Sequence, residues 1–288
     1  MTQDNHFDAL IPSAMAQKAE ELGVRKANMP ASKLFLLAIL AGAFIGLGAA
    51  CFTTTLAGSA ALPFGMARLL ASLTFCLGLI LVIVGGAELF TGNSLIVMAW
   101  ASGKINTVAL LRNWGIVYVG NFIGALGTAV LMFLGRQYTN GAGSVGEVAL
   151  RTAAAKVQFG FVQAIALGII CNGLVCMAVW LTYSARNTTD KIMSIIFPIT
   201  AFVLLGTEHS IANMYFIPYG LLIKQFDPAF VTGLGDKVNL TNLSWTTCFL
   251  NNLLPVTLGN IIGGALLVGA IYWLIYLQGT NDSQPTKS

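Results

Sequence analysis

The sequence has very few charged residues. Only 9% of its 288 residues are Asp, Glu, Lys or Arg, whereas 56% are hydrophobic. A soluble domain carries about 25% charged residues, so this chain cannot cover a water-facing surface. Its 15 basic and 11 acidic residues form no basic stripe, which argues against nucleic acid as a partner. The shortage of charge excludes an ordinary soluble enzyme and a disordered chain, and it indicates a polytopic membrane protein.

Residues that could bind a metal ion are also scarce, and so are motifs that contain a catalytic nucleophile. The only histidines are His6 and His209, and the spacing of the five cysteines does not match a zinc site. The Gly-x-Ser-Gly motif of rhomboid-type hydrolases is missing, since Trp100 stands where Ser102-Gly103 would need the first glycine. We therefore predict a protein that is not an enzyme and that holds no metal or cofactor.

Long uncharged stretches dominate what is present. About 20 apolar residues are needed to cross a bilayer as a helix, and these stretches are too continuous for the strands of a β-barrel. We predict an all-α membrane protein in which the second and fifth of six spans are interrupted. The spans are expected at residues 34–57, 65–100, 107–135, 157–184, 191–223 and 249–277.

The segments outside the spans predict the orientation. Residues 1–33 are polar, and a short amphipathic helix over Pro12–Leu22, ended by Gly23, is expected to lie on the membrane surface. A mobile plug, or a docking element for a cytoplasmic partner, is the alternative. With both termini cytoplasmic, including the tail at 279–288, nine basic residues face inside and six outside. This distribution follows the positive-inside rule.

Two patterns occur twice in the same order. Gly-x-Glu-x4-Asn occurs at Gly86–Asn93 and again at Gly206–Asn213, and Asn-x6-Gly-Asn-x2-Gly occurs at 113–124 and again at 252–263. We infer two homologous halves of three spans each, about 34–135 and 157–278. An odd number of spans makes the two copies cross the membrane in opposite senses, as in inverted-repeat transporters.

In inverted-repeat folds the substrate path lies near the midplane, at discontinuous helices. Each interrupted span here holds a glycine, a glutamate and an asparagine, and we expect Asn93 and Asn213 to start new half-helices. The N-termini of two half-helices that face one cavity would favour anions.

The second interruption contains the one intramembrane histidine. His209 follows Glu208, and an imidazole exchanges protons near neutral pH, so we predict that His209 lines the path. Thr91, in the first interruption, can offer a hydroxyl to the same space or bond back to its own helix. The glutamates are either part of the path or structural carboxylates satisfied by hydrogen bonds.

Small residues recur at helical spacing in the spans. Gly42-x3-Gly46, Gly120-x3-Gly124 and Gly259-x3-Gly263 are typical of helices that approach each other closely. Phe75, Leu79, Leu89 and Phe202 flank the interruptions. They are either membrane core or, if they face the path, dry constrictions that exclude hydrated ions.

Several of these segments carry a resemblance. Ile83–Gly92 resembles the first signature of the formate/nitrite transporter family, and Gly168–Ala178 resembles the second, departing from it at Gly173. The segments 62–67 and 208–214 fit the same family, so the resemblance covers nearly the whole chain. Residues 4–24 are similar to the formate-transporting members rather than to the nitrite-transporting ones.

The resemblance implies an aquaporin-like protomer of six helices, five protomers per assembly and a bacterial inner-membrane location. By matching position, it implies Thr91 and His209 as a central pair with Asn172 and Glu208 close by. It further implies an outer constriction formed by Phe75, Leu79 and Phe202. It implies an inner constriction formed by Leu89, Phe90 and Val175. Lys156 is implied as a cation in the vestibule.

The function implied is a membrane channel for formate that passes small monovalent anions of weak acids, with or without protonation at the central histidine. A nitrite or hydrosulfide channel of the same family is the alternative. A water or neutral-solute channel is a more distant one, since the paired Asn-Pro-Ala elements of water channels do not occur.

Overall fold

The computed structural model describes residues 9–59 and 61–279, and every regular element in these two ranges is a helix. The first eight residues and the tail at 280–288 lie outside the described part. Within the described ranges, five helices are long and apolar enough to cross a membrane: Ala31–Ala57, Phe64–Gly85, Thr107–Leu134, Phe161–Ser184 and Trp245–Tyr276.

The elements follow one another with short connections. In chain order they are α1 (Pro12–Ala27), α2 (Ala31–Ala57), α3 (Phe64–Gly85), η1 (Gly92–Ile96), α4 (Val97–Ala101), α5 (Thr107–Leu134), η2 (Gln137–Thr139), α6 (Ser144–Lys156), α7 (Phe161–Ser184), α8 (Thr188–Leu204), α9 (Ser210–Phe226), α10 (Pro228–Leu234), η3 (Gly235–Lys237), α11 (Trp245–Thr247), η4 (Cys248–Leu253), α12 (Leu254–Ile261), η5 (Ile262–Ala270) and α13 (Ile271–Tyr276). The last long helix contains the two π-helical stretches η4 and η5.

Two of the predicted spans are interrupted in the structure. Helix α3 ends before Gly86, whose φ is +80°, and α8 is followed by Gly206 with a φ of +69°. Glycine adopts this left-handed conformation without steric cost. The interruption at residues 205–209 divides the fifth predicted span into α8 and α9, of 17 residues each, so this span is not one continuous helix.

The residues that begin the new half-helices differ from those predicted. His209, not Asn213, is the N-cap of α9, and its Nδ1 accepts the amide of Ala212 at 3.0 Å. The short helix η1 begins at Gly92, before Asn93. Expecting Asn93 and Asn213 to start half-helices was wrong, because both lie inside helices that begin before them. Their side-chain amides instead donate to the preceding glutamates.

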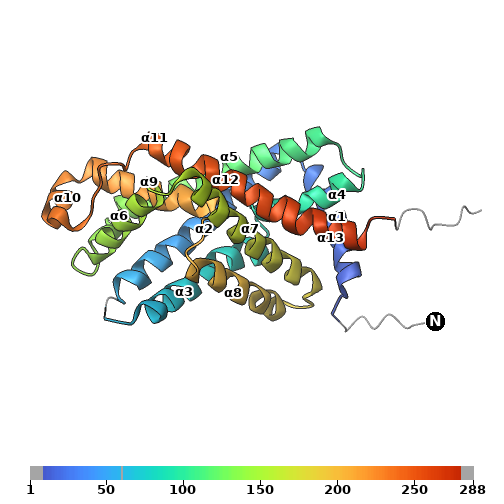
Figure 1. Ribbon diagram of the computed structural model, residues 1–288, viewed down its shortest axis with the longest axis horizontal. Coiled ribbons are helices and arrows are strands. Elements are labelled where there is room, and N and C mark those ends of the chain that lie inside the picture. Colours follow the sequence, from blue (N-terminus) through green and yellow to red (C-terminus); the bar gives the residue numbers. More distant parts are fainter. Residues whose placement is uncertain (1–8, 60, 280–288) are drawn as a thin grey trace, which may run out of the picture.

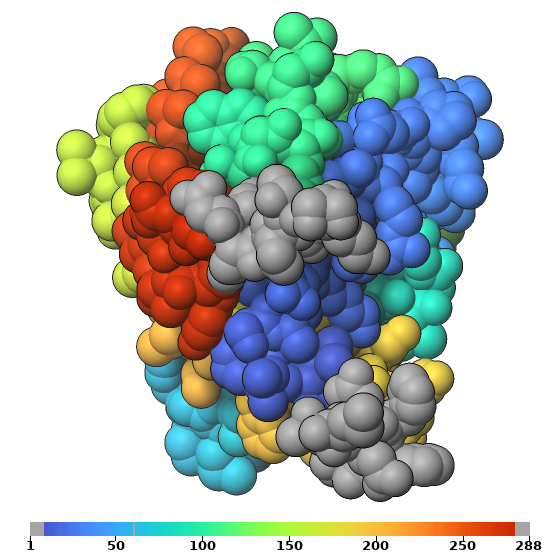
Figure 2. Space-filling view, turned by 90° about the vertical axis from the view of Figure 1, so that its right-hand side faces the viewer, coloured from blue at the N-terminus to red at the C-terminus, as the bar shows by residue number. Residues whose placement is uncertain are grey.

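The N-terminal helix is longer than the sequence pattern indicated. Helix α1 continues through Gly23 to Ala27, so the predicted end at Gly23 was wrong. A Cβ on Gly23 would lie 3.0 Å from Ala99 Cβ, and glycine here serves close packing rather than helix termination. Buried residues Met15, Ala16 and Ala19 hold α1 against the protein, and Figure 2 shows α1 in dark blue across one end of the molecule.

Figure 1 shows the two amphipathic helices at opposite ends, α1 beside α4 and α13, and α6 beside α9 and α10. Between them, glycines bring two pairs of long helices into backbone contact. On α5, a Cβ at Gly124 would overlap the carbonyl oxygen of Ile39 on α2. On the last helix, a Cβ at Gly263 would overlap the carbonyl oxygen of Ile169 on α7. The same contact therefore occurs in both halves, as the predicted packing role of these glycines requires.

We predict that Gly124→Ala prevents stable folding. The added methyl group has no space against the α2 backbone, and forcing two packed helices apart costs at least about 1–3 kcal/mol. Size-exclusion chromatography of the detergent-purified protein measures the effect as loss of the folded species. The matched control is Gly127→Ala on the same helix, where a Cβ meets nothing within 4 Å. Equal behaviour of the two variants would contradict the packing role.

Candidate functional site

A buried carboxylate lies at each helix interruption and is held by the same residue types in both halves. The Oε2 atom of Glu88 accepts hydrogen bonds from the side-chain amide of Asn93 at 2.8 Å and from the ammonium of Lys26 at 3.0 Å. In the second half, Glu208 accepts from Asn213 at 2.6 Å and from Lys156 at 2.7 Å. The glutamates of the repeated motif are thus anchored, satisfied carboxylates in both halves.

A second pair of asparagines holds the extended backbone of each interruption. Asn121 on α5 accepts from the amide of Phe90 at 2.9 Å and donates to the carbonyls of Ala38 and Glu88. Asn260 on α12 accepts from the amide of Ser210 at 2.9 Å and donates to the corresponding carbonyls, those of Gly168 and Glu208. These asparagines are the ones in the second repeated sequence pattern. They satisfy backbone groups that a lipid environment could not.

The repetition extends beyond the ranges predicted from the sequence. The side-chain amide of Asn113 donates to the backbone carbonyl of Lys26 in α1 at 3.0 Å. The amide of Asn252 donates likewise to the carbonyl of Lys156 in α6 at 2.8 Å. Lys26 and Lys156 lie outside the predicted halves 34–135 and 157–278. The equivalent contacts therefore make α1 the counterpart of α6.

The two interruptions meet at Thr91 and His209. The Thr91 hydroxyl lies 2.9 Å from His209 Nε2, and both side chains are buried. Because Nδ1 accepts the amide proton of Ala212, the proton of the neutral ring must lie on Nε2. The ring therefore donates to the Thr91 hydroxyl, and capping of α9 sets which tautomer faces the centre of the protein.

A cavity of about 430 Å³ reaches this histidine from the end of the molecule that carries α6. Aromatic residues make up much of its wall, namely Phe52, Phe64, Phe75, Phe159, Phe202 and Phe216. Its polar groups include Arg68, Lys156, Glu208 and His209. The predicted vestibule residue Lys156 and the predicted central residue Glu208 both face this cavity.

A much smaller void of about 10 Å³ touches the other side of the same residues. It is lined by His209 and by apolar side chains: Ile45, Phe75, Leu79, Leu89, Val175, Ile199 and Phe202. Such a space holds about one water molecule. Phe75 and Phe202 line both cavities and meet edge to face at 5.6 Å, so these two rings separate the open cavity from the narrow one.

Five of the six residues predicted to form the two constrictions line this void, namely Phe75, Leu79, Leu89, Val175 and Phe202. The sixth, Phe90, packs edge to face against Trp114 and Tyr118 of α5 and lines neither cavity. Ile45 and Ile199 line the void but were not predicted, because nothing in the apolar sequence distinguishes them from lipid-facing neighbours.

Asn172 serves the scaffold around the central pair. Its side-chain amide donates to the Ser94 hydroxyl at 3.1 Å and to the carbonyl of Asn260 at 2.7 Å. It lines neither the cavity nor the void. Its hydrogen bonds connect η1 of the first half with α12 of the second, and so they help to hold the two interruptions together.

Comparison with known proteins agrees with this architecture. The family model for formate/nitrite transporters matches residues 13–274. The formate channel FocA of Escherichia coli K12 is 48% identical over 280 residues, covering 96% of this chain and 98% of the relative. FocA of Haemophilus influenzae is 40% identical, covering 91% and 93%. A probable formate transporter of Methanothermobacter thermautotrophicus is 34% identical, covering 93% and 97%.

Solved structures are similar as well. A pentameric formate channel with formate bound matches with a TM-score of 0.80 and 45% identity, covering 86% of this chain and 98% of that one. An ion channel of the same family matches with a TM-score of 0.76 and 27% identity, covering 91% and 98%.

The fold and its central polar pair define a helical membrane protein with two interrupted helices that meet between two halves. This chain belongs to the formate/nitrite transporter family. The resemblance predicted from the signature segments is confirmed, and the relatives and structures compared here carry the names of channels and transporters.

Proposed function

We propose that this protein is a formate channel, in which formate enters the cavity of about 430 Å³ beside α6, named the outer cavity from here on, and crosses the membrane past Thr91 and His209. The observation that carries the proposal is a cavity that ends at a buried polar pair behind two aromatic rings. Support comes from a chain that matches formate channels over nearly its full length.

The narrow void restricts what can pass. Moving a bare anion into a medium of low dielectric constant costs of order 20 kcal/mol by the idealised Born estimate, whereas a neutral acid avoids most of this cost. A formate ion that takes up a proton next to His209 would cross the apolar residues as formic acid. The proton faces the path on Nε2, because Nδ1 is engaged with the Ala212 amide.

Proton donation by this ring is linked to the cap of α9. A neutral imidazole is too weak an acid to protonate formate, so Nδ1 must first take up a proton from water. Nε2 of the resulting imidazolium then gives its proton to formate, which leaves a neutral ring and formic acid. A protonated Nδ1 cannot accept the amide of Ala212, so the cap hydrogen bond opens during each transfer. The proposed relay therefore includes a transient loosening at the start of α9.

We propose a homopentameric assembly in a bacterial inner membrane, with both termini cytoplasmic and the outer cavity on the opposite side. The pentamer rests on the name of the matched solved structure, and the orientation rests on the distribution of basic residues. If a cytoplasmic partner binds the N-terminal segment, we propose that it binds the exposed side of α1.

We predict that proteoliposomes containing this protein take up radiolabelled formate faster than protein-free liposomes, and faster at pH 5.5 than at pH 7.5. The measurement uses nitrite, and hydrosulfide detected chemically, as competing substrates at both pH values. Preferred uptake of nitrite or hydrosulfide would reassign the substrate within the family. Rapid osmotic swelling without anion uptake would favour a water or neutral-solute channel and would contradict the proposal.

A further inference from the structure

Arg68, in the second turn of α3, carries a charge that the mechanism above does not use. Its Nη2 donates to the backbone carbonyl of Val203 at 2.8 Å, which is the only hydrogen bond of this side chain among the described residues. Its Nε is buried and has no partner. The guanidinium group lines the outer cavity together with Lys156 and His209. A guanidinium has five N–H donors, so most of its binding capacity is unused.

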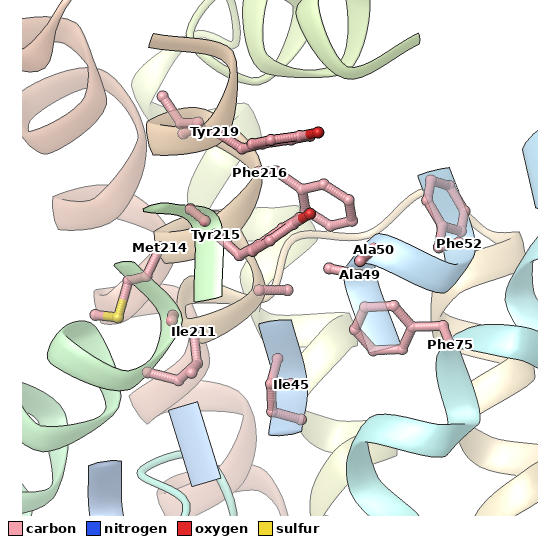
Figure 3. Close-up of a cluster of buried hydrophobic side chains, with 14 of the residues drawn as sticks. Ile45, Ala49, Ala50, Phe52, Phe75, Ile211, Met214, Tyr215, Phe216 and Tyr219 are labelled. Carbon is pink, nitrogen blue, oxygen red and sulfur yellow. The ribbon is translucent and has the colours of Figure 1, made fainter. Parts of the chain in front are cut away.

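Aromatic rings hold this group at the cavity wall opposite Lys156. The guanidinium carbon of Arg68 lies 5.4 Å from the centre of the Phe52 ring, and the ammonium of Lys156 lies 5.3 Å from that of Phe216. The two rings meet edge to face at 5.7 Å, and Figure 3 shows them facing each other from α2 and α9. One pair of rings thus supports both cations.

The two cations differ in how their charge is balanced. Lys156 is paired with the buried carboxylate of Glu208 at 2.7 Å. Arg151, also at the cavity, is paired with Glu147 at 2.7 Å. Arg68 forms no ion pair with any carboxylate of residues 9–59 and 61–279. The Glu208 carboxylate also acts on Arg68 from beyond ion-pair distance, but its direct partner is Lys156. Among the described cations that line the outer cavity, Arg68 is therefore the one without a carboxylate in contact, whereas the lysine predicted to gather anions is paired.

Arg68 also lies close to the helix interruption. A Cβ built on Gly206 would be 3.4 Å from its Nη2, so the guanidinium packs against the glycine of the interruption that follows α8. Three backbone amides at the interruptions, those of Phe90, Ser210 and Ala212, cannot donate to an anion because they already form hydrogen bonds within the protein. Side-chain charge, rather than these amides, remains to attract an anion into the cavity.

We propose that Arg68 forms the anion-binding subsite of the outer cavity, where its guanidinium receives a small monovalent oxyanion before that ion reaches His209. A carboxylate accepts two parallel N–H bonds from one guanidinium, which suits formate. This inference rests on the proposed function and adds to it the residue that determines affinity for the anionic form.

The test compares Arg68→Gln and Arg68→Met, which remove the charge, with Arg68→Lys, which retains it. Right-side-out membrane vesicles report the formate concentration that gives half-maximal uptake, and calorimetry of the purified protein reports formate binding without transport. We expect each charge-removing variant to raise the half-saturating concentration about tenfold, with a maximal rate within about twofold of wild type. Arg68→Lys should stay within about threefold. Added salt should weaken uptake by the wild type more than uptake by Arg68→Gln.

The matched control is Lys237→Gln. Its side chain is 62% exposed on the same side of the protein and outside the cavity, so the same loss of charge there should leave half-saturation unchanged. Normal half-saturation in Arg68→Gln or Arg68→Met would overturn the inference, and so would a defect in Arg68→Lys as large as theirs. If wild-type vesicles took up no formate, the channel proposal would fail. Calorimetry would then still decide whether formate binding depends on Arg68.

Discussion

Replacing His209 with asparagine is expected to abolish the pH dependence of formate uptake while α9 stays capped. Asparagine is among the best N-cap residues, so its side-chain oxygen can accept the Ala212 amide as Nδ1 now does. It has no titratable nitrogen that could take up a proton and pass one to formate. Positioned acid–base groups accelerate reactions by about 10²–10⁴-fold, and we expect uptake at pH 7.5 to fall by about two orders of magnitude.

The measurement is the rate of radiolabelled formate uptake in proteoliposomes between pH 5.5 and 8, together with the accompanying proton flux. His209→Leu serves as the companion variant, since it removes both the cap and the proton carrier. We expect it to lower the melting temperature as well as uptake, which separates the two roles of the ring. A wild-type pH profile in an assembled His209→Asn protein would rule out the relay and leave the channel assignment intact.

Glu208→Ala should destabilise the protein strongly. The carboxylate is paired with Lys156, and the side-chain exposures of the two residues are 2% and 14%. Asn213 and Asn252 also donate to it. Breaking a buried ion pair by removing one partner costs about 3–5 kcal/mol. Thermal unfolding of the detergent-purified protein should therefore show a melting temperature lower by about 10 °C.

Two further variants test the cause of this effect. Glu147→Gln removes the acid from a pair whose arginine is 59% exposed, and it should change the melting temperature by no more than about 2 °C. Glu208→Gln combined with Lys156→Met removes both charges of the pair, so neither partner is left as an unpaired buried charge, and it should be more stable than Glu208→Ala. Equal losses in the exposed and buried pairs would be inconsistent with the burial argument.

Some features of the structure could be predicted from local sequence. Gly86 and Gly206 mark the two interruptions because glycine tolerates a left-handed backbone without steric cost. The glycines at 124 and 263 indicate close helix contacts for an equally local reason, the lack of a Cβ. Gly23 shows the limit of such reasoning. Glycine is favoured both at helix ends and at close contacts, and only the presence of Ala99 against it decides between the two.

Partners in the site could not be predicted in the same way. Asn213 was predicted to start a helix because asparagine caps helices well. In the structure His209 caps α9 four residues earlier, and the side-chain amide of Asn213 donates to Glu208 and Asn252. Phe90 and Phe202 are equally apolar in sequence. One packs against α5 and the other lines the cavity, since the path of the backbone on each side of an interruption sets where its side chains point.

By itself, the sequence determined that this protein is a helical membrane protein in which two patterns recur in the same order, with glycine and glutamate at both helix interruptions and histidine at the second. Composition, length of the apolar stretches and repeated spacing carry this information, because each depends only on neighbours along the chain. The tertiary structure alone decided that Lys156 is paired with Glu208 and that Arg68 has no carboxylate of the described residues within ion-pair distance. Charge balance depends on which groups from distant segments lie within a few ångströms of one another, and packing between α3, α6, α8 and α9 sets those distances.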